Sequence, residues 1–146
     1  MTMPQVAFHF NAPNKLDYAC RFIRKALRHD ARVTVVAPLD RLRQLSTKLW
    51  KLAGHEFLAH SVQGDDAEIF ALAPVVLVES ALHGTHQDIL LNLGDEMPEG
   101  FDQFVKVVEV VSSFDEQDRA MARVRWRAYQ AEGHAIERFD LVLKEG

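Results

Sequence analysis

Three short runs of apolar residues limit most strongly what this chain can fold into. They are Pro74–Glu79, Asp88–Leu93 and Val105–Val111, and each is apolar almost without interruption. A strand with one face in water alternates polar and apolar residues, whereas a strand inside a parallel sheet is covered on both faces and is apolar throughout. The three runs therefore predict buried strands of a parallel sheet.

The N-terminal part of the chain predicts the same architecture. A strand is expected over Gln5–Phe10, an amphipathic helix over Lys15–Arg28, a short buried strand over Arg32–Ala37 and a second helix over Pro38–Lys51. A right-handed crossover is the usual connection between parallel strands of one sheet. The fold class is therefore α/β, a three-layer Rossmann-like domain with a mainly parallel central sheet.

One domain is expected over the whole chain, 1–146. A length of 146 residues is enough to bury a core, and 48% apolar with 26% charged residues is ordinary for a globular domain. No internal repeat or linker interrupts the sequence. At the margins of the sheet, Phe57–Val62 is expected to be a short edge strand or an extended loop, and Ile136–Leu143 a final edge strand.

The overall charge limits the partners that the chain can have. The formal net charge is −4, whereas a general nucleic-acid binder needs an excess of Lys and Arg for its phosphate contacts. Cys20 is the only cysteine, so no internal disulfide is expected. No basic start leads into an apolar segment, and no apolar run approaches the roughly 18 residues of a membrane span. A cytoplasmic protein without membrane contact is expected.

The stretch Asp115–Gly133 predicts a helix with charges arranged along its dipole. Acidic residues open the stretch, arginines fill its second half and Gly133 ends it. At about 100° per residue, its apolar residues gather on one side, which is expected to face the sheet. These residues are Met121, Val124, Ala128 and Ala131, with Phe114 near them.

The opposite side of the same helix is cationic. Arg119, Arg123, Trp126 and Arg127 fall within about a quarter-turn of each other, so Trp126 is expected to lie off the core face. One interpretation is a solvated charged face, with Trp126 packed under a neighbouring loop or strand. The other is a receptor in which Trp126 supplies an apolar wall and Arg119 and Arg123 hold carboxylates or phosphates by forked hydrogen bonds.

Candidates for catalysis or cofactor binding are few. The turn after the first strand, Asn11–Asn14, contains no glycine, and no P-loop pattern occurs elsewhere, so neither common nucleotide-phosphate loop is recognisable. His83 and His86 with Asp88 are too few ligands to indicate a metal site. Cys20 falls on the core-facing side of its helix and is expected to be an inert thiol. We assign no catalytic residue, cofactor or metal.

Three motifs, taken in their order and spacing, point to a known family. The motifs are Asp88-Ile-Leu-Leu-Asn-Leu-Gly94 followed by Pro98 and Phe101, then Phe104–Val111, and then Arg123-x-Arg-x-Arg-Ala-Tyr129 with Gly133. In these features the chain resembles the chi subunit of bacterial DNA polymerase III holoenzyme. The resemblance covers essentially the whole length.

The resemblance implies a non-catalytic accessory subunit of the clamp-loader complex. Such a subunit forms a heterodimer with the small psi subunit and binds the C-terminal tail of single-stranded DNA-binding protein, without sequence-specific contact to nucleic acid. That tail is acidic and ends in a phenylalanine with a free carboxylate, so it needs cations and an apolar pocket. The psi surface is expected to be an apolar patch on another face.

The resemblance also implies which residues form the tail site. The family's basic positions correspond to Arg119 and Arg123, and the aromatic position beside them corresponds to Trp126, where the best-known relatives have tyrosine. Gln130 stands where relatives can have a basic residue. The expected tail-binding residues are Arg119, Arg123, Trp126, Trp50, Phe57 and Arg127.

Two other functions compete with this interpretation. A nucleotide- or small-molecule-binding enzyme is favoured by the Rossmann-like fold but opposed by the missing glycine loop. Direct binding of single-stranded DNA would use Trp50, Trp126 and the arginines as stacking platforms. It is opposed by the net charge of −4.

Overall fold

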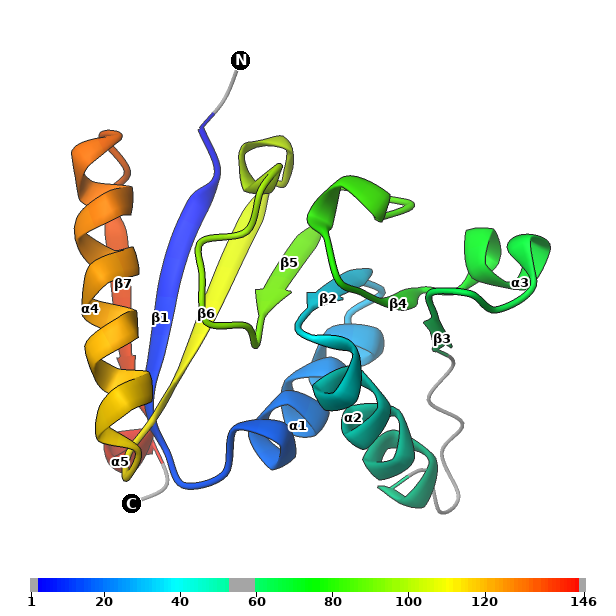
Figure 1. Ribbon diagram of the computed structural model, residues 1–146, viewed down its shortest axis with the longest axis horizontal. Helices are drawn as coiled ribbons and strands as arrows, with labels where there is room; N and C mark the ends of the chain where they lie inside the picture. The colour runs from blue at the N-terminus through cyan, green and yellow to red at the C-terminus, as the bar shows by residue number, and fades with distance from the viewer. Residues whose placement is uncertain (1–2, 53–59, 145–146) are drawn as a thin grey trace.

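The computed structural model describes residues 3–52 and 60–144. Within them, seven strands form one sheet in the order β3-β4-β2-β5-β6-β1-β7, and every neighbouring pair is parallel (Figure 1). The predicted α/β fold with a parallel sheet is confirmed. The strands are β1 (Gln5–Ala12), β2 (Val33–Val36), β3 (Ser61–Val62), β4 (Val75–Val78), β5 (Ile89–Asn92), β6 (Lys106–Ser112) and β7 (Ile136–Asp140).

Helices cover both faces of this sheet. Successive residues of a strand point to opposite faces, and on β5 Leu91 packs with α1 and α2 while Leu90 packs with α4. The fold therefore has three layers, as predicted. The helices are α1 (Lys15–Arg28), α2 (Leu39–Leu52), α3 (Ala67–Leu72), α4 (Glu116–Ala131) and α5 (Leu141–Lys144), with short 3₁₀ turns η1 (Ala81–His83) and η2 (Phe101–Gln103).

The first two helices lie where the sequence predicts them. Helix α1 begins after Asn14, whose side-chain oxygen accepts a hydrogen bond from the Asp17 amide at 3.0 Å, as an N-cap residue does. Helix α2 buries Leu42, Leu45 and Leu49 completely. Their spacing of three and four residues places them on one face of the helix.

The margins of the sheet differ in part from the prediction. Only Ser61 and Val62 of the 57–62 segment are a described strand, at the β3 edge, and Phe57 lies outside the described residues. The final strand is shorter than predicted because the chain turns into α5 after Asp140. The Asp140 carboxylate accepts a hydrogen bond from the Val142 amide at 3.0 Å, which starts that helical turn.

Helix α3 has no counterpart in the sequence prediction. The Asp66 side chain caps it by accepting hydrogen bonds from the amides of Glu68 and Ile69. None of its residues is fully buried, and six residues are too few for an apolar periodicity to be recognised in the sequence.

Helix α4 confirms the predicted location but is rotated relative to the predicted core face. Val124 is 65% exposed and Phe114 is 79% exposed, so the apolar stripe points away from the sheet. The buried side instead carries polar residues that bond to the buried Glu109 of β6. Trp126, expected off the core face, packs at its margin against Phe8. The buried residues of the helix are Asp118, Ala122, Arg125 and Tyr129.

Candidate functional site

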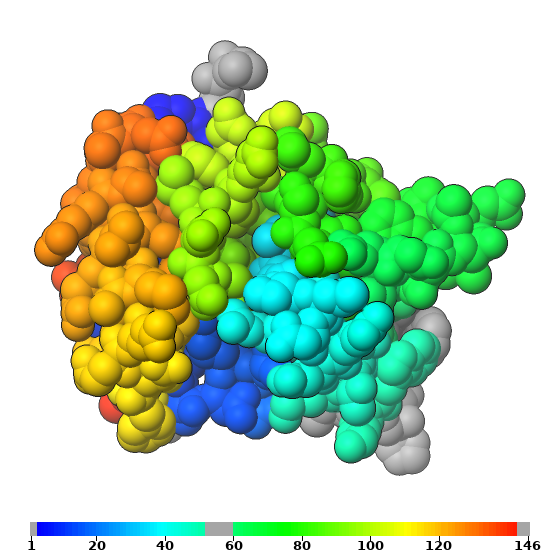
Figure 2. Space-filling model, viewed as in Figure 1, coloured from blue at the N-terminus to red at the C-terminus, as the bar shows by residue number. Residues whose placement is uncertain are grey.

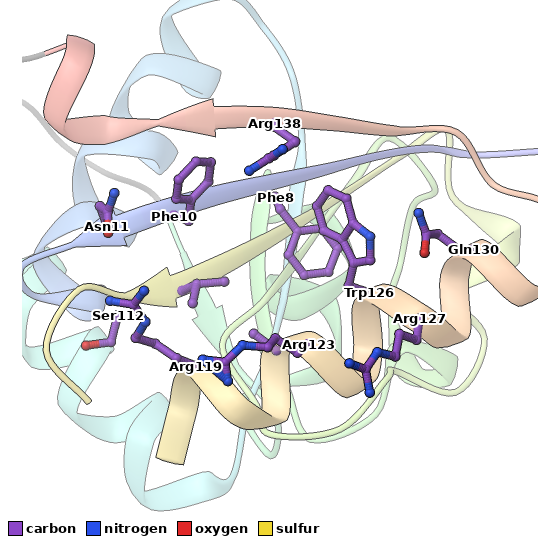
Figure 3. A pocket seen from close by; sticks show the side chains of 12 residues that line it. Phe8, Phe10, Asn11, Ser112, Arg119, Arg123, Trp126, Arg127, Gln130 and Arg138 are labelled. Carbon is purple, nitrogen blue, oxygen red and sulfur yellow. The ribbon is translucent and has the colours of Figure 1, made fainter. Parts of the chain in front are cut away.

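A groove of about 490 Å³ lies between α4 and the strands β1 and β7 (Figure 3). The end of β6 forms part of its floor. We call this groove the arginine groove. It is lined by Phe8, Phe10, Asn11, Val111, Ser112, Arg119, Ala122, Arg123, Trp126, Arg127, Gln130 and Arg138.

Aromatic and aliphatic side chains form the inner surface of the arginine groove. The ring centroids of Phe8 and Trp126 are 5.0 Å apart in an edge-to-face arrangement, which is a favourable geometry for an aromatic pair. Val111 and Ala122 are buried beside them, and Phe10 is partly buried. The groove therefore offers an apolar surface to a ligand side chain.

Four arginines surround this apolar surface, and no acidic residue of the described ranges 3–52 and 60–144 lines it. Among the described residues, none of the four forms an ion pair. Arg119 donates a hydrogen bond from Nη1 to the Ser113 carbonyl at 3.1 Å. The four positive charges therefore stay available to an anionic ligand, although the whole chain is acidic.

A buried polar network fixes the rotation of α4 about its axis. Glu109 Oε1 lies 2.9 Å from Arg125 Nε, and the Tyr129 hydroxyl donates to Glu109 Oε2 at 2.8 Å. Asn92 Nδ2 also donates to this carboxylate, and Arg125 Nη1 donates to the Asp95 carbonyl at 2.8 Å. These contacts hold the Arg125 and Tyr129 side of α4 against β6, so the flank with Arg119, Arg123 and Trp126 faces the arginine groove.

Burial dominates the acid–base behaviour of this network. Desolvation raises the pKa of Glu109, and the nearby guanidinium of Arg125 and the hydrogen bonds from Asn92 and Tyr129 oppose that rise. Burial and the Glu109 charge both raise the pKa of Tyr129. Tyr129 therefore stays protonated and continues to donate to the carboxylate at neutral pH.

Two comparisons identify the family. The family model described as "DNA polymerase III chi subunit, HolC" matches residues 3–137. The chain belongs to the DNA polymerase III chi subunit family. A curated relative, DNA polymerase III subunit chi of Pseudomonas aeruginosa, is 33% identical over 124 residues, which cover 84% of each chain. The chain is therefore a DNA replication protein, an accessory subunit of DNA polymerase III.

The structure brings together four of the six residues that the sequence assigns to a tail site. Arg119, Arg123, Trp126 and Arg127 all line the arginine groove of this chi-family chain. Their role in binding stays a prediction. Trp50 does not line this groove.

Trp50 lies elsewhere in the fold, near the end of α2. It is 55% exposed, and its ring centroid is 4.9 Å from that of His60. Helix α2 packs beside β3 and β4, whereas α4 packs beside β6 and β7. The helix that carries Trp50 and the helix that lines the arginine groove therefore pack beside different strands of the sheet.

Several groove residues were not predicted as site residues. Phe8 and Phe10 alternate along β1 and were interpretable only as core residues. Arg138 joins the groove because β7 pairs with β1, with Arg138 beside Phe8. No sequence signal indicated that pairing. Arg138 also lies just beyond the residues that the chi family model matches.

The described residues contain no group of three or more His, Cys, Asp or Glu side chains placed to hold a metal ion. His86, considered above with His83 and Asp88, is partly buried, and desolvation lowers its pKa.

No helix in the described part of the chain has the length and apolar character needed to cross a membrane.

Proposed function

We propose that this chi-family chain binds the acidic C-terminal tail of single-stranded DNA-binding protein in the arginine groove. The observation that carries the proposal is the set of four arginines without carboxylate partners, among the described residues, around an aromatic pocket. A tail that ends in phenylalanine has the complementary groups. Its ring fits the apolar surface, and its carboxylates fit the guanidinium groups.

The balance of energies predicts weak binding. Burial of a phenylalanine ring contributes about 1.5–3 kcal/mol, and each exposed ion pair contributes about 0.2–1 kcal/mol. Association itself costs at least about 4 kcal/mol. The net favourable free energy is therefore small, and binding is expected to be weak, far from the roughly 12 kcal/mol of a nanomolar complex.

In this proposal the chain also pairs with the psi subunit, through a second surface. Trp50, Ile69 and Leu72, which we call the distal patch, are large exposed hydrophobic residues on α2 and α3, the two helices that flank the edge strand β3. Figure 2 shows α3 projecting on the side of the molecule opposite α4. A contiguous exposed apolar surface marks a protein interaction site, and in this proposal these three side chains contribute to such a surface for psi.

Two surfaces far apart make the chain a tether rather than an enzyme. One partner at the distal patch and another in the arginine groove can be bound together without collision. A clamp-loader complex that holds psi would then be kept near template coated with single-stranded DNA-binding protein. The benefit is a higher local concentration, which requires no catalytic group.

Calorimetry with an acidic peptide that ends in phenylalanine tests the tail site. Arg123→Ala is expected to weaken binding about five-fold, the upper range for one exposed ion pair. Removal of the terminal phenylalanine from the peptide is expected to abolish measurable binding, because the ring supplies the largest favourable contribution. A thermal melt of Arg123→Ala should match that of the native chain, since Arg123 is exposed.

The matched control is Arg43→Ala on α2, an exposed arginine outside the arginine groove. It should leave peptide affinity unchanged. Equal affinities of the Arg123→Ala and native proteins, or of the full and shortened peptides, would refute the tail site. A single-stranded oligonucleotide that competed with the peptide at equal concentration would instead favour direct DNA binding.

A further inference from the structure

Arg138 of β7 lies over the arginine groove and contacts two aromatic rings at once. Its guanidinium carbon is 5.6 Å from the ring centroid of Phe10 and 5.7 Å from that of Trp126. Both distances fall within the range of about 6 Å for cation–π contacts. Phe10 comes from β1 and Trp126 from α4, so Arg138 connects the two walls of the groove (Figure 3).

The sheet register explains why Arg138 points into the groove. Arg138 is the partner of Phe8 where β7 pairs in parallel with β1. Paired residues of neighbouring strands point to the same face of a sheet, and Phe8 points to the face covered by α4. In the described part of the chain, the contacts of the Arg138 guanidinium are these two rings, with no ion pair to a carboxylate.

We propose that Arg138 makes the groove selective for a tail whose terminal side chain is an aromatic ring. This inference rests on the proposed tail site. Val111 and Ala122 line the same groove as Phe10, Trp126 and Arg138. A ring bound in this groove can therefore come within reach of the guanidinium. A cation is attracted to the negative face of an aromatic ring, whereas an aliphatic ring of similar size lacks that charge distribution.

Two tail peptides test this selectivity, one ending in phenylalanine and one in cyclohexylalanine. The measured quantity is the ratio of their dissociation constants, because the ratio cancels effects common to both peptides. Arg138→Met removes the cation and keeps an apolar side chain of similar length. The preference for phenylalanine is expected to be about two- to five-fold greater in the native chain than in Arg138→Met, the size of an exposed cation–π contact.

Two further variants separate this effect from general loss of charge. Arg127→Met removes another cation of the same groove, one with no aromatic contact among the described residues. It should weaken the binding of both peptides by the same factor and leave the ratio of their dissociation constants unchanged. Arg138→Lys keeps a cation and should retain part of the preference.

The outcomes distinguish this inference from the proposed function. An unchanged ratio in Arg138→Met, while Arg123→Ala still weakens binding, would overturn the selectivity and leave the tail site standing. Tighter binding of both peptides by Arg138→Met would show that the guanidinium occupies the ring site, and would also overturn it. A native chain that binds neither peptide would refute the tail site and this inference together.

Discussion

Arg125 and Arg123 lie two residues apart on α4, in opposite environments. Arg125 is 2% exposed, and its guanidinium bonds to the Glu109 carboxylate and to the Asp95 carbonyl. Arg123 is exposed and lines the arginine groove, where no carboxylate faces it among the described residues. An arginine can be buried only with such partners. Where they are missing, the charge stays in water and remains available to a ligand.

The largest expected difference between the two arginines is in stability. Arg125→Met leaves the Glu109 carboxylate buried without its cation, and loss of one partner of a buried ion pair costs about 3–5 kcal/mol. Arg123→Met removes an exposed side chain and should change the free energy of unfolding by less than about 0.5 kcal/mol. Urea denaturation of both variants measures this. Equal destabilisation would show that the buried network does not hold α4.

Removal of the Tyr129 hydroxyl is expected to lower the free energy of unfolding by less than Arg125→Met does, and it tests the same buried network. Tyr129→Phe keeps the ring and removes the hydrogen bond to Glu109 Oε2. A hydrogen bond to a charged group contributes about 1.5–3 kcal/mol, and urea denaturation should show a loss of this size. A free energy of unfolding equal to that of the native chain would mean that the hydroxyl does not stabilise the carboxylate.

The pH dependence of stability tests the burial of Glu109. Its pKa in the folded chain is raised above the ordinary value of 4.5, so the folded state binds this proton more tightly than the unfolded chain does. Its contribution is therefore complete below the unfolded pKa and is lost as pH rises through the folded value. The difference in unfolding free energy between the native chain and Glu109→Gln should fall as pH rises above 4.5. A rising difference would contradict this.

The smallest expected effect is that of salt, which should weaken the interactions of the exposed arginines more than those of the buried Arg125. Exposed charges are screened by salt, whereas buried pairs are screened much less. Higher sodium chloride should weaken tail binding by roughly 1 kcal/mol, the order of a few exposed ion pairs, and should change the destabilisation caused by Arg125→Met far less. Calorimetry and urea denaturation in the same buffers measure both quantities. Tail affinity independent of salt would argue against the arginines as ligands.

The sequence predicted which residues of α4 lie together but not which of them face the sheet. The angles between Arg119, Arg123 and Trp126 around the helix axis depend only on helix geometry. In the structure these three residues line one groove. The rotation of the whole helix depends on Arg125 and Tyr129, which bond to Glu109. Hydrophobic periodicity treats a buried arginine as an exposed residue, so the apolar stripe with Val124 was assigned to the wrong side.

The rest of the groove depends on contacts between distant parts of the chain. Strands β2, β4, β5 and β6 were predictable because their apolar runs are strong, and so were the helices α1 and α2. The pairing of β7 with β1, which brings Arg138 to Phe8, has no local signal. Trp50 resembled a site residue by family position alone, and the structure places it near the end of α2, the helix that packs beside β3 and β4.

The chain contains two tryptophans, Trp126 in the arginine groove and Trp50 in the distal patch. Their indole N–H signals in an NMR spectrum give the most direct test of the tail site. Titration of ¹⁵N-labelled protein with the acidic peptide should shift the indole signal of Trp126, which lines the arginine groove, and leave that of Trp50 in place. Movement of the Trp50 signal with an unmoved Trp126 signal would contradict the account and place the tail at the distal patch.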